Sequence, residues 1–338
     1  MEVSKGFCYA ERGVAAIIIK HRKRPVKIDG YEALLKRLPI YHPKKETVED
    51  LLNSSKAGYG GEQRLDHLMK HFDPDYEHLI IQDLSISKDM ELQVDTVLLT
   101  RSCIVLLEVK NISGRLKFSV NPSALHQTTQ SGKERGYKSP LVQMEVIKWK
   151  FEKVLESLNY SLPVSTFLVI AYPNQIVEST PPGSVIWSAD EVMVRLQNFR
   201  RPPERITSVE LLNLGDQLVA RHAEYSSFPL TPKLEIQLED IETGVFCPNC
   251  KFMKMNKIHR SWKCQACEIT DSEAHHTAIR EWFMLIKPTI SAAECQEFLG
   301  LRYASTARNF LAHPRYKKVG SNKTRRYYLE EKVDIHEK

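Results

Sequence analysis

The chain has 338 residues, 42% of them hydrophobic, and a formal net charge of +6 at pH 7. A chain of this length can bury a sizeable core and favours two or three globular domains. The longest apolar run near the N-terminus, 14–19, is far shorter than the roughly 20 residues that a membrane span needs, and no cleavage pattern follows it. We therefore expect a cytoplasmic protein without membrane contact, whose mild positive charge permits an anionic partner.

The first fifty residues, 1–50, are expected to be a lead-in segment. They contain a basic run at 21–27 and a short amphipathic stretch at 31–38, which prolines close. The four basic side chains of this run could contact nucleic acid, but a solvated face is the preferred interpretation. The four are His21, Arg22, Lys23 and Arg24.

The next region, 51–205, has the element order of an α/β domain. A helix with apolar positions at Leu65, Leu68, Met69 and Phe72 begins it. Strands are then predicted at 79–84, 92–100, 103–110 and 115–120, followed by a polar loop, a helix at 141–158 and a strand at 165–171. A helix at 209–225 and a linker at 226–233 occupy the stretch 206–243.

Two carboxylates are expected to meet on this sheet. In the strand at 104–110, Glu108 and Lys110 share a face, because side chains alternate between the two faces of a strand. The connection from the preceding strand is only Arg101-Ser102, which predicts an antiparallel hairpin that brings Asp95 near Glu108.

Two helices add polar groups to the same place. Glu62 and Gln143 continue the apolar stripes of their helices and are expected to face inward. Buried carboxylates without partners cost several kcal/mol, so a bound cation or the Lys110 ammonium must offset them. The alternative without a catalytic function is an ordinary ion pair of Glu108 with Lys110 at a sheet edge, beside a solvent-facing Asp95.

Phosphodiester hydrolysis suits this set of residues. Asp95, Glu108 and the Val109 carbonyl would supply oxygen ligands for Mg²⁺ or Mn²⁺. Lys110 would orient or activate the attacking water and stabilise the pentavalent phosphate. Glu62 would be an outer ligand or assist the base, and Gln143 would position the other groups.

Four sequence motifs resemble the NERD (nuclease-related) domain: Gly58-Tyr59-Gly60-Gly61-Glu62, Gln93-Val94-Asp95, Leu107-Glu108-Val109-Lys110-Asn111 with Gly114, and Pro140-Leu141-Val142-Gln143. That family is placed in the PD-(D/E)xK superfamily. The resemblance covers about 50–175 and implies a restriction-endonuclease-like mixed sheet flanked by helices, with a Mg²⁺-dependent nuclease site. It also implies that Glu62, Asp95, Glu108, Lys110 and Gln143 are site residues, although activity varies among such relatives.

Four cysteines predict a zinc ribbon at 244–272. Two Cys-x-x-Cys pairs, Cys247 with Cys250 and Cys264 with Cys267, have the spacing of a closed tetrahedral site, so the zinc would be structural. Cys8, Cys103 and Cys295 are expected to be reduced thiols. His275 and His276 are spare ligands, better explained as surface or helix-start residues. Basic and aromatic residues between the pairs suit nucleic acid, and a protein-docking role suits them equally well.

The segment 275–332 predicts a winged helix-turn-helix. A helix at 278–286, a capping box at Ser291 and a helix at 303–312 precede a hairpin at 315–329. The second helix would enter the DNA major groove and the wing would contact phosphates, whereas a helical protein-interaction module is the alternative. The groove residues would be Arg302, Ser305, Thr306, Arg308 and Asn309, and the wing residues Lys317, Lys318, Lys323, Arg325 and Arg326.

Together these features predict a metal-dependent nuclease that acts on nucleic acid, with DNA as the expected substrate. Cutting both strands of a duplex would favour a homodimer. The principal alternative is a non-catalytic DNA-binding or regulatory scaffold with a nuclease-like fold. A protein-interaction module without nucleic acid is a third alternative, which would have to explain the uniform positive charge of the wing.

Overall fold

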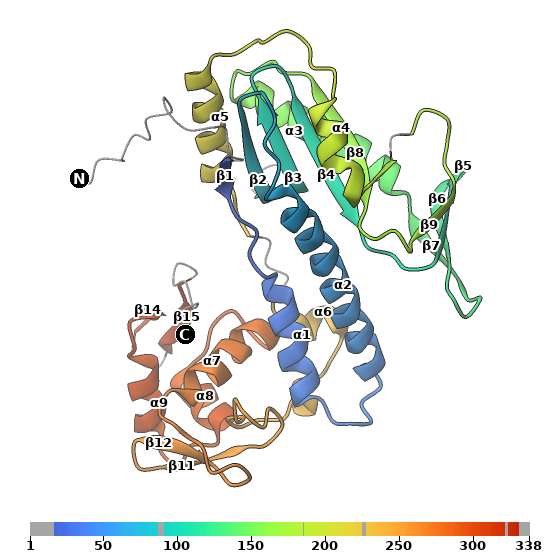
Figure 1. Cartoon of the computed structure of the whole chain (residues 1–338). Helices are drawn as coiled ribbons and strands as arrows, with labels where there is room; N and C mark the ends of the chain where they lie inside the picture. Colours follow the sequence, from blue (N-terminus) through green and yellow to red (C-terminus); the bar gives the residue numbers. More distant parts are fainter. Residues whose placement is uncertain (1–16, 87–90, 185, 225–227, 322–323, 331–338) are drawn as a thin grey trace. The chain divides into compact units, whose positions relative to one another are not determined.

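The computed structural model describes residues 17–86, 91–184, 186–224, 228–321 and 324–330. The chain divides into two compact units (Figure 1). Unit 1 comprises 1–24 and 56–225, and unit 2 comprises 25–55 and 226–338. In the described part of the chain, none of the helices has the length and apolar character that a membrane span requires.

Unit 1 is built on a six-stranded mixed sheet, as predicted. Its strand order is β1 (Ile17–Lys20), β2 (His78–Ile86), β3 (Leu92–Thr100), β4 (Ile104–Lys110), β8 (Val164–Ile170) and β10 (Ile186–Ser188). The pairs β1–β2, β4–β8 and β8–β10 are parallel. The pairs β2–β3 and β3–β4 are antiparallel, which confirms the predicted hairpin across Arg101-Ser102.

Helices cover both faces of this sheet. On one face, α3 (Pro140–Ser157) and α5 (Ser208–Ala220) bury residues such as Phe151 and Leu214 against the strands. On the other face lie α2 (Lys45–Met69), the 3-10 turn η1 (Ala189–Glu191) and α4 (Val192–Gln197), with Leu65 and Leu196 in the core. Burial of apolar stripes on both faces explains why the central strands are almost continuously hydrophobic.

A second sheet of four strands replaces the predicted polar loop. Its order is β7 (Glu134–Lys138), β6 (Ser123–Thr128), β5 (Arg115–Val120) and β9 (Ile176–Ser179). Leu116, Phe118 and Leu125 pack against Met144 of α3. The loop prediction was wrong because every residue of the edge strand β7 is exposed, so its sequence carries no apolar alternation. Gly114 precedes β5 with φ of 91°, and a Cβ there would lie 2.4 Å from the Thr128 carbonyl oxygen.

Unit 2 contains short helices and two small sheets. Its elements, besides the first part of α2, are α1 (Val26–Arg37), α6 (Leu230–Leu234), η2 (Leu238–Asp240), β11 (Met255–Ile258), β12 (Ser261–Cys264), β13 (Thr270–Asp271), α7 (Ala274–Leu285), α8 (Ala292–Leu299), α9 (Ala304–Leu311), β14 (Tyr316–Val319) and β15 (Arg326–Leu329). Strands β11–β13 form one antiparallel sheet, and β14–β15 form a hairpin.

One hydrophobic core joins these elements. Leu34 of α1, Leu230 of α6, Trp262 of the ribbon, Leu285 of α7 and Tyr327 of the hairpin all belong to it. The first fifty residues are therefore not a separate lead-in: β1 joins the sheet of unit 1, and α1 joins the core of unit 2. The predicted linker likewise carries core residues at α6, which local sequence could not reveal because its Ser-Pro-Thr composition resembles that of a loop.

An ion pair fixes α1 against α7 inside unit 2. Arg37 is completely buried and donates from Nη2 to Glu281 Oε2 at 2.6 Å. The same guanidinium donates to the carbonyl oxygens of Glu242 and Gly244 at 2.6 and 3.2 Å. Because its donors are satisfied on several sides, this buried charge meets the condition under which such a pair is tolerated.

Candidate active site and zinc site

The carboxylates predicted to meet do so where strands β3 and β4 part. Regular pairing ends at Thr96 opposite Leu107, one step before Asp95 would face Glu108. The Asp95 carboxylate instead accepts a hydrogen bond from the Val109 backbone N–H at 2.7 Å. Both carboxylates are only 7% exposed. The fork therefore holds two acidic side chains in a site that the sheet and its helices shield from water.

Glu108, Lys110 and Gln143 form a closed hydrogen-bonded triangle. Lys110 Nζ donates to Glu108 Oε1 at 2.6 Å and to Gln143 Oε1 at 3.2 Å, and Gln143 Nε2 donates to Glu108 Oε1 at 3.0 Å. Gln143 lies in the first turn of α3 and is exposed, so the expectation that it faces inward was wrong. It lies on the rim of the site because α3 begins only at Pro140, where little of the helix yet covers the sheet.

Arg22 is a site residue that sequence reasoning missed. Its side chain is only 2% exposed, and it donates to Glu62 Oε2 at 2.8 Å, to Asp66 Oδ2 at 2.8 Å and to the Asp95 carbonyl oxygen at 2.6 Å. The basic run 21–24 was interpreted as a solvated face, and for Arg22 this was wrong. The run itself holds no signal that separates Arg22 from its neighbours, since its partners lie 40 or more residues away.

Glu62 is linked to the site by Arg22, which pairs with the Glu62 carboxylate and also bonds the Asp95 carbonyl oxygen. Helix α2 lies on the face opposite α3, and the Glu62 carboxylate reaches the strand fork from that side. Gly61 permits the close approach, because a Cβ there would lie 2.7 Å from the Asn111 Cβ. Asn111 also donates from Nδ2 to the Ala57 carbonyl at 2.7 Å, which ties α2 to the end of β4. Two of the motif residues thus serve to dock the helix.

Burial and like charge dominate the electrostatics of the fork. Burial, followed by the neighbouring Asp95 charge, raises the pKa of Glu108 to about 7 despite the opposing Lys110 ammonium. Burial also raises the pKa of Asp95, although Lys110 and Arg22 oppose it. Burial acts to lower the pKa of Lys110, but Glu108, Asp95 and Glu62 outweigh it and the net shift is upward. Lys110 is therefore a cation near neutral pH, whereas Glu108 readily holds a proton.

The fork suits a divalent cation bound by two carboxylates. Mg²⁺ is commonly held by one or two protein carboxylates and otherwise by water and substrate phosphate oxygens. The Lys110 carbonyl accepts from Ala171 after β8 at 3.0 Å. Since backbone groups alternate between the two edges of a strand, the Val109 carbonyl points toward β3 and Asp95. Asp95, Glu108 and this carbonyl could thus share an ion, while Arg22 already engages Glu62.

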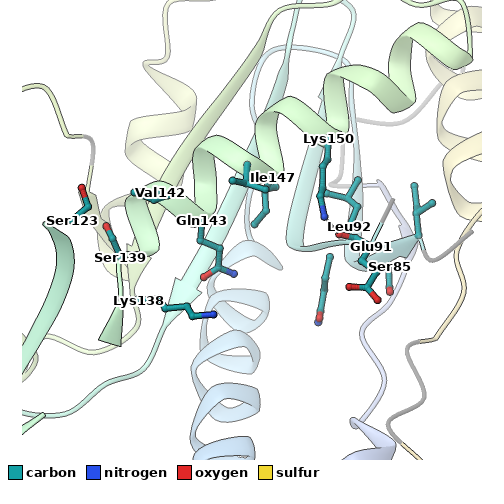
Figure 2. A pocket seen from close by; sticks show the side chains of 13 residues that line it. Ser85, Glu91, Leu92, Ser123, Lys138, Ser139, Val142, Gln143, Ile147 and Lys150 are labelled. Carbon is teal, nitrogen blue, oxygen red and sulfur yellow. Dashed lines mark hydrogen bonds between the residues drawn. The ribbon is translucent and has the colours of Figure 1, made fainter. Parts of the chain in front are cut away.

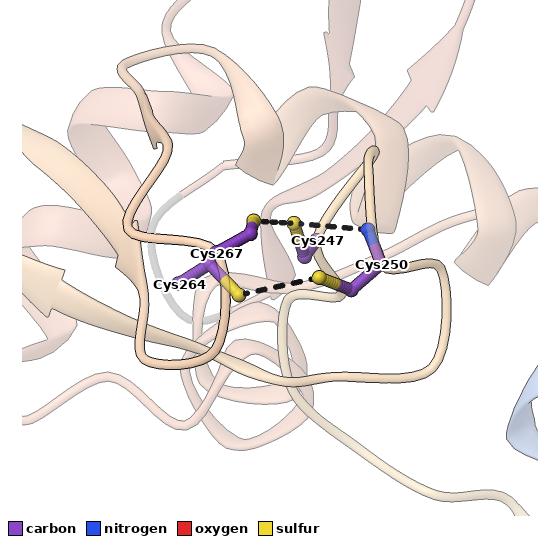
Figure 3. A group of neighbouring side chains, drawn as sticks. All are labelled: Cys247, Cys250, Cys264 and Cys267. Carbon is purple, nitrogen blue, oxygen red and sulfur yellow. Dashed lines mark hydrogen bonds between the residues drawn. The ribbon is translucent and has the colours of Figure 1, made fainter.

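The four predicted zinc ligands lie together in unit 2 (Figure 3). The sulfurs of Cys247, Cys250, Cys264 and Cys267 are all within 4.8 Å of one another, with Cys247 to Cys267 at 3.6 Å and Cys250 to Cys264 at 3.9 Å. Four sulfurs about 2.3 Å from a central zinc ion would lie about 3.8 Å apart. The cluster therefore fits a structural zinc site. Cys103 and Cys295 are buried elsewhere as free thiols, and Cys8 lies outside the described residues.

His275 and His276 begin α7 but do not lie on the surface as expected. Both are buried, His275 stacks on Phe310 with ring centroids 3.6 Å apart, and His276 Nδ1 lies 2.7 Å from the Tyr316 hydroxyl. Burial lowers the pKa of His275 to about 4 and that of His276 to about 3. These two side chains connect α7 to α9 and to the hairpin, and the cysteine cluster does not include them.

The C-terminal helices and hairpin follow the predicted winged helix-turn-helix order, α7, α8, α9 and then β14–β15. Ser291 forms the predicted capping box with Glu294. Of the side chains expected to face DNA, Ser305, Arg308 and Asn309 are exposed on α9 and Thr306 is half-buried there. Arg302 is also exposed, but it lies two residues before the helix begins.

The predicted wing residues fall into two groups. Lys318 and Arg325 are exposed, and Lys317 forms a partly exposed pair with Glu330 at 3.2 Å. Arg326 needs a different interpretation, because it donates to Glu294 Oε2 at 2.6 Å and to Thr289 Oγ1 at 2.7 Å and so anchors the wing to α8. Lys323 lies outside the described residues.

Comparison with known families gives one match, a nuclease-related domain (NERD) model that covers residues 57–171. This part of the chain matches the nuclease-related domain family. The matched segment begins five residues before Glu62 and ends directly after β8, so it contains Asp95, Glu108, Lys110 and Gln143. Arg22 and all of the ribbon lie outside it. Neither the curated proteins nor the solved structures give a significant match.

The pKa of Glu108 leads to a pH-dependent difference in stability. A carboxyl group whose folded-state pKa is raised from 4.5 to about 7 stabilises the fold below pH 4.5, and this contribution is lost as pH rises through 7. In chelator, we expect wild type to lose up to about 3 kcal/mol relative to Glu108→Gln between pH 4.5 and 8, since one pKa unit is about 1.4 kcal/mol. Denaturant unfolding of both proteins between pH 4.5 and 8 measures this loss. A difference in the free energy of unfolding that stays constant across the range would contradict the raised pKa of Glu108.

Removing zinc should affect the whole of unit 2. Chelation should not unfold the ribbon alone, because Cys247, Cys264 and Trp262 share one core with α1 and α7. Hydrogen exchange should therefore accelerate in α1 and α7 as well as in the ribbon when zinc is removed, while β8 of unit 1 keeps its protection. Cys264→Ser should lose zinc and show the same pattern, whereas Cys295→Ala should retain zinc. Unchanged protection in α7 after complete zinc loss would contradict this coupling.

Proposed function

We propose that the protein is a divalent-metal-dependent nuclease that hydrolyses phosphodiester bonds in DNA. The observation that carries the proposal is the burial of Asp95 and Glu108 at the strand fork, beside a cationic Lys110 held by Gln143. Raised pKa values mark these carboxyl groups as destabilised in their charged form. Carboxyl groups with perturbed pKa values cluster at functional sites. A bound cation would stabilise the charged form of both groups.

The charge balance of the site supports one divalent ion. The carboxylates are Glu62, Asp66, Asp95 and Glu108, and the cations are Arg22 and Lys110. Four negative and two positive groups leave two negative charges, which one Mg²⁺ or Mn²⁺ would neutralise. Asp95, Glu108 and the Val109 carbonyl would hold that ion. It would polarise a phosphoryl oxygen and stabilise the charge that develops on phosphate during hydrolysis.

Lys110 would act as a donor and not as the base. Its pKa is raised by the surrounding carboxylates, so the ammonium keeps its proton and could hydrogen-bond the attacking water or a phosphate oxygen. Gln143 would fix the ammonium, since it bonds both Lys110 and Glu108. Arg22 would be a positioning residue that holds Glu62 and Asp66, which revises our expectation that Glu62 is an outer metal ligand or assists the base.

The C-terminal unit would bring the enzyme to DNA. Helix α9 exposes Ser305, Arg308 and Asn309, and Arg302 is exposed just before it. These side chains, with Thr306 beside them, would reach base edges in a major groove. Lys318 and Arg325 of the wing, with Lys317 and Lys323, would contact phosphates. A structural zinc ion would stabilise this unit through the core that the ribbon shares with α7.

Cleavage assays test the enzymatic proposal. We expect the purified protein to cut plasmid, linear or single-stranded DNA with Mg²⁺ or Mn²⁺ and to stop when chelator is added. Lys110→Ala should lower the rate by about 100-fold or more, in the range of a lost transition-state donor. Lys133→Ala, a change of an exposed lysine outside the site, should cut at the wild-type rate. DNA binding without cleavage by the wild type would instead support a non-catalytic scaffold.

The proposal for the wing makes a separate prediction about binding. Arg325→Ala should weaken duplex binding and reduce the slope of log K against log salt by about 0.9, as expected when one phosphate contact is lost. Arg195→Ala, at an arginine of α4 that is 56% exposed, should leave both quantities unchanged. Fluorescence anisotropy between low and physiological salt measures them. Equal slopes for wild type and Arg325→Ala would place the contact elsewhere.

A further inference from the structure

A pocket of about 750 Å³ adjoins the strand fork within unit 1 (Figure 2). It lies along α3, and Gln143 belongs both to its lining and to the hydrogen-bonded triangle with Glu108 and Lys110. A ligand in this pocket would therefore lie directly next to any phosphate bound at the fork. We propose that the pocket binds unpaired nucleotides that flank the scissile phosphate, an inference that rests on the proposed nuclease function.

The chemistry of the lining suits bases joined by phosphates. The side chains of Val142, Val146 and Ile147 form an apolar wall along α3, and Ile86 and Leu92 add to it. Apolar walls of this kind hold the faces of an unpaired base. Lys138 lies toward the Gln143 end of the pocket, whereas Lys150 and Glu91 lie at the other end (Figure 2). There the Lys150 ammonium donates to the Glu91 carbonyl at 2.5 Å.

The charge at one end of the pocket and the length of the pocket along α3 favour a single strand of nucleic acid as the ligand. Lys138 is exposed at the end nearest the site, where it could meet the phosphate that follows the scissile one. The lining helix runs from Val142 to Lys150, a rise of about 12 Å, which matches roughly three stacked nucleotides of one strand. An apolar wall gives a fully paired duplex little to bind, because the faces of its bases are stacked inside and its outer surface consists of the charged backbone and the polar base edges.

Val146 offers a substitution that changes the pocket without disturbing the core. Its side chain is 46% exposed, so Val146→Glu places a carboxylate in the pocket at little cost to packing. Val194→Glu is the matched control, since Val194 is 59% exposed on α4 and does not line the pocket.

The test compares cleavage of a single strand with that of its fully paired duplex. Wild type should cut the single strand about ten-fold faster or more, because contact with even one base is worth about a factor of ten. Val146→Glu should lose this preference with an unchanged duplex rate, and Val194→Glu should keep it. Equal wild-type rates, or an unchanged preference in Val146→Glu, would overturn the inference while leaving the nuclease proposal intact.

Crosslinking provides a readout that does not depend on cleavage. A short single-stranded oligonucleotide carrying 4-thiothymidine, irradiated with the full chain in chelator, should crosslink to peptides from 138–150. Val146→Glu should reduce this product and Val194→Glu should not. Crosslinks confined to 302–330 would overturn the pocket assignment. If wild type cuts no substrate but crosslinks within 138–150, the nuclease proposal fails while the nucleotide site stands.

Discussion

The burial of two carboxylates at the β3–β4 fork is the constraint on which the organisation of unit 1 depends. Asp95 and Glu108 lose most of their hydration, and a buried charge must be compensated by donors or by cations. The compensation comes from three directions: the Val109 N–H within the sheet, Lys110 with Gln143 on the α3 side, and Arg22 with α2 on the other. Displacing either helix would leave charge uncompensated, so fold and site support each other.

This compensation is incomplete, because the pKa values of both carboxyl groups remain raised. Glu108 would titrate near neutral pH because burial and Asp95 outweigh the attraction of Lys110. The pKa of Lys110 is also raised, because the neighbouring carboxylates stabilise its ammonium form. Lys110 therefore keeps its proton and its positive charge. Under the proposed function, an ion with two positive charges would bind the deprotonated carboxylates, and the Lys110 ammonium would then be available to contact phosphate.

Unit 2 is held together by a single hydrophobic core, which the ribbon, the helices and the hairpin share. Trp262 of the ribbon packs near His275 and Phe310, and His276 bonds Tyr316 of the hairpin. Arg37 ties α1 to α7 through Glu281 and lies over the Phe298 ring of α8, with its guanidinium carbon 4.5 Å from the ring centroid. A metal held at the cysteine cluster would therefore stabilise α7, α8 and the wing as well as its own loops, because small units have too little apolar surface to fold as separate modules.

The sequence by itself determined what depends on local periodicity. Strand alternation and the two-residue connection Arg101-Ser102 sufficed to bring Asp95, Glu108 and Lys110 together, and the Cys-x-x-Cys spacing sufficed to gather the four cysteines. Only the tertiary structure revealed the role of Arg22, the exposed edge strand β7, the rim position of Gln143 and the shared core of unit 2. These depend on which distant segments pack together, and a side chain acquires its partner across 40 or more residues only once the loops between them have taken their paths.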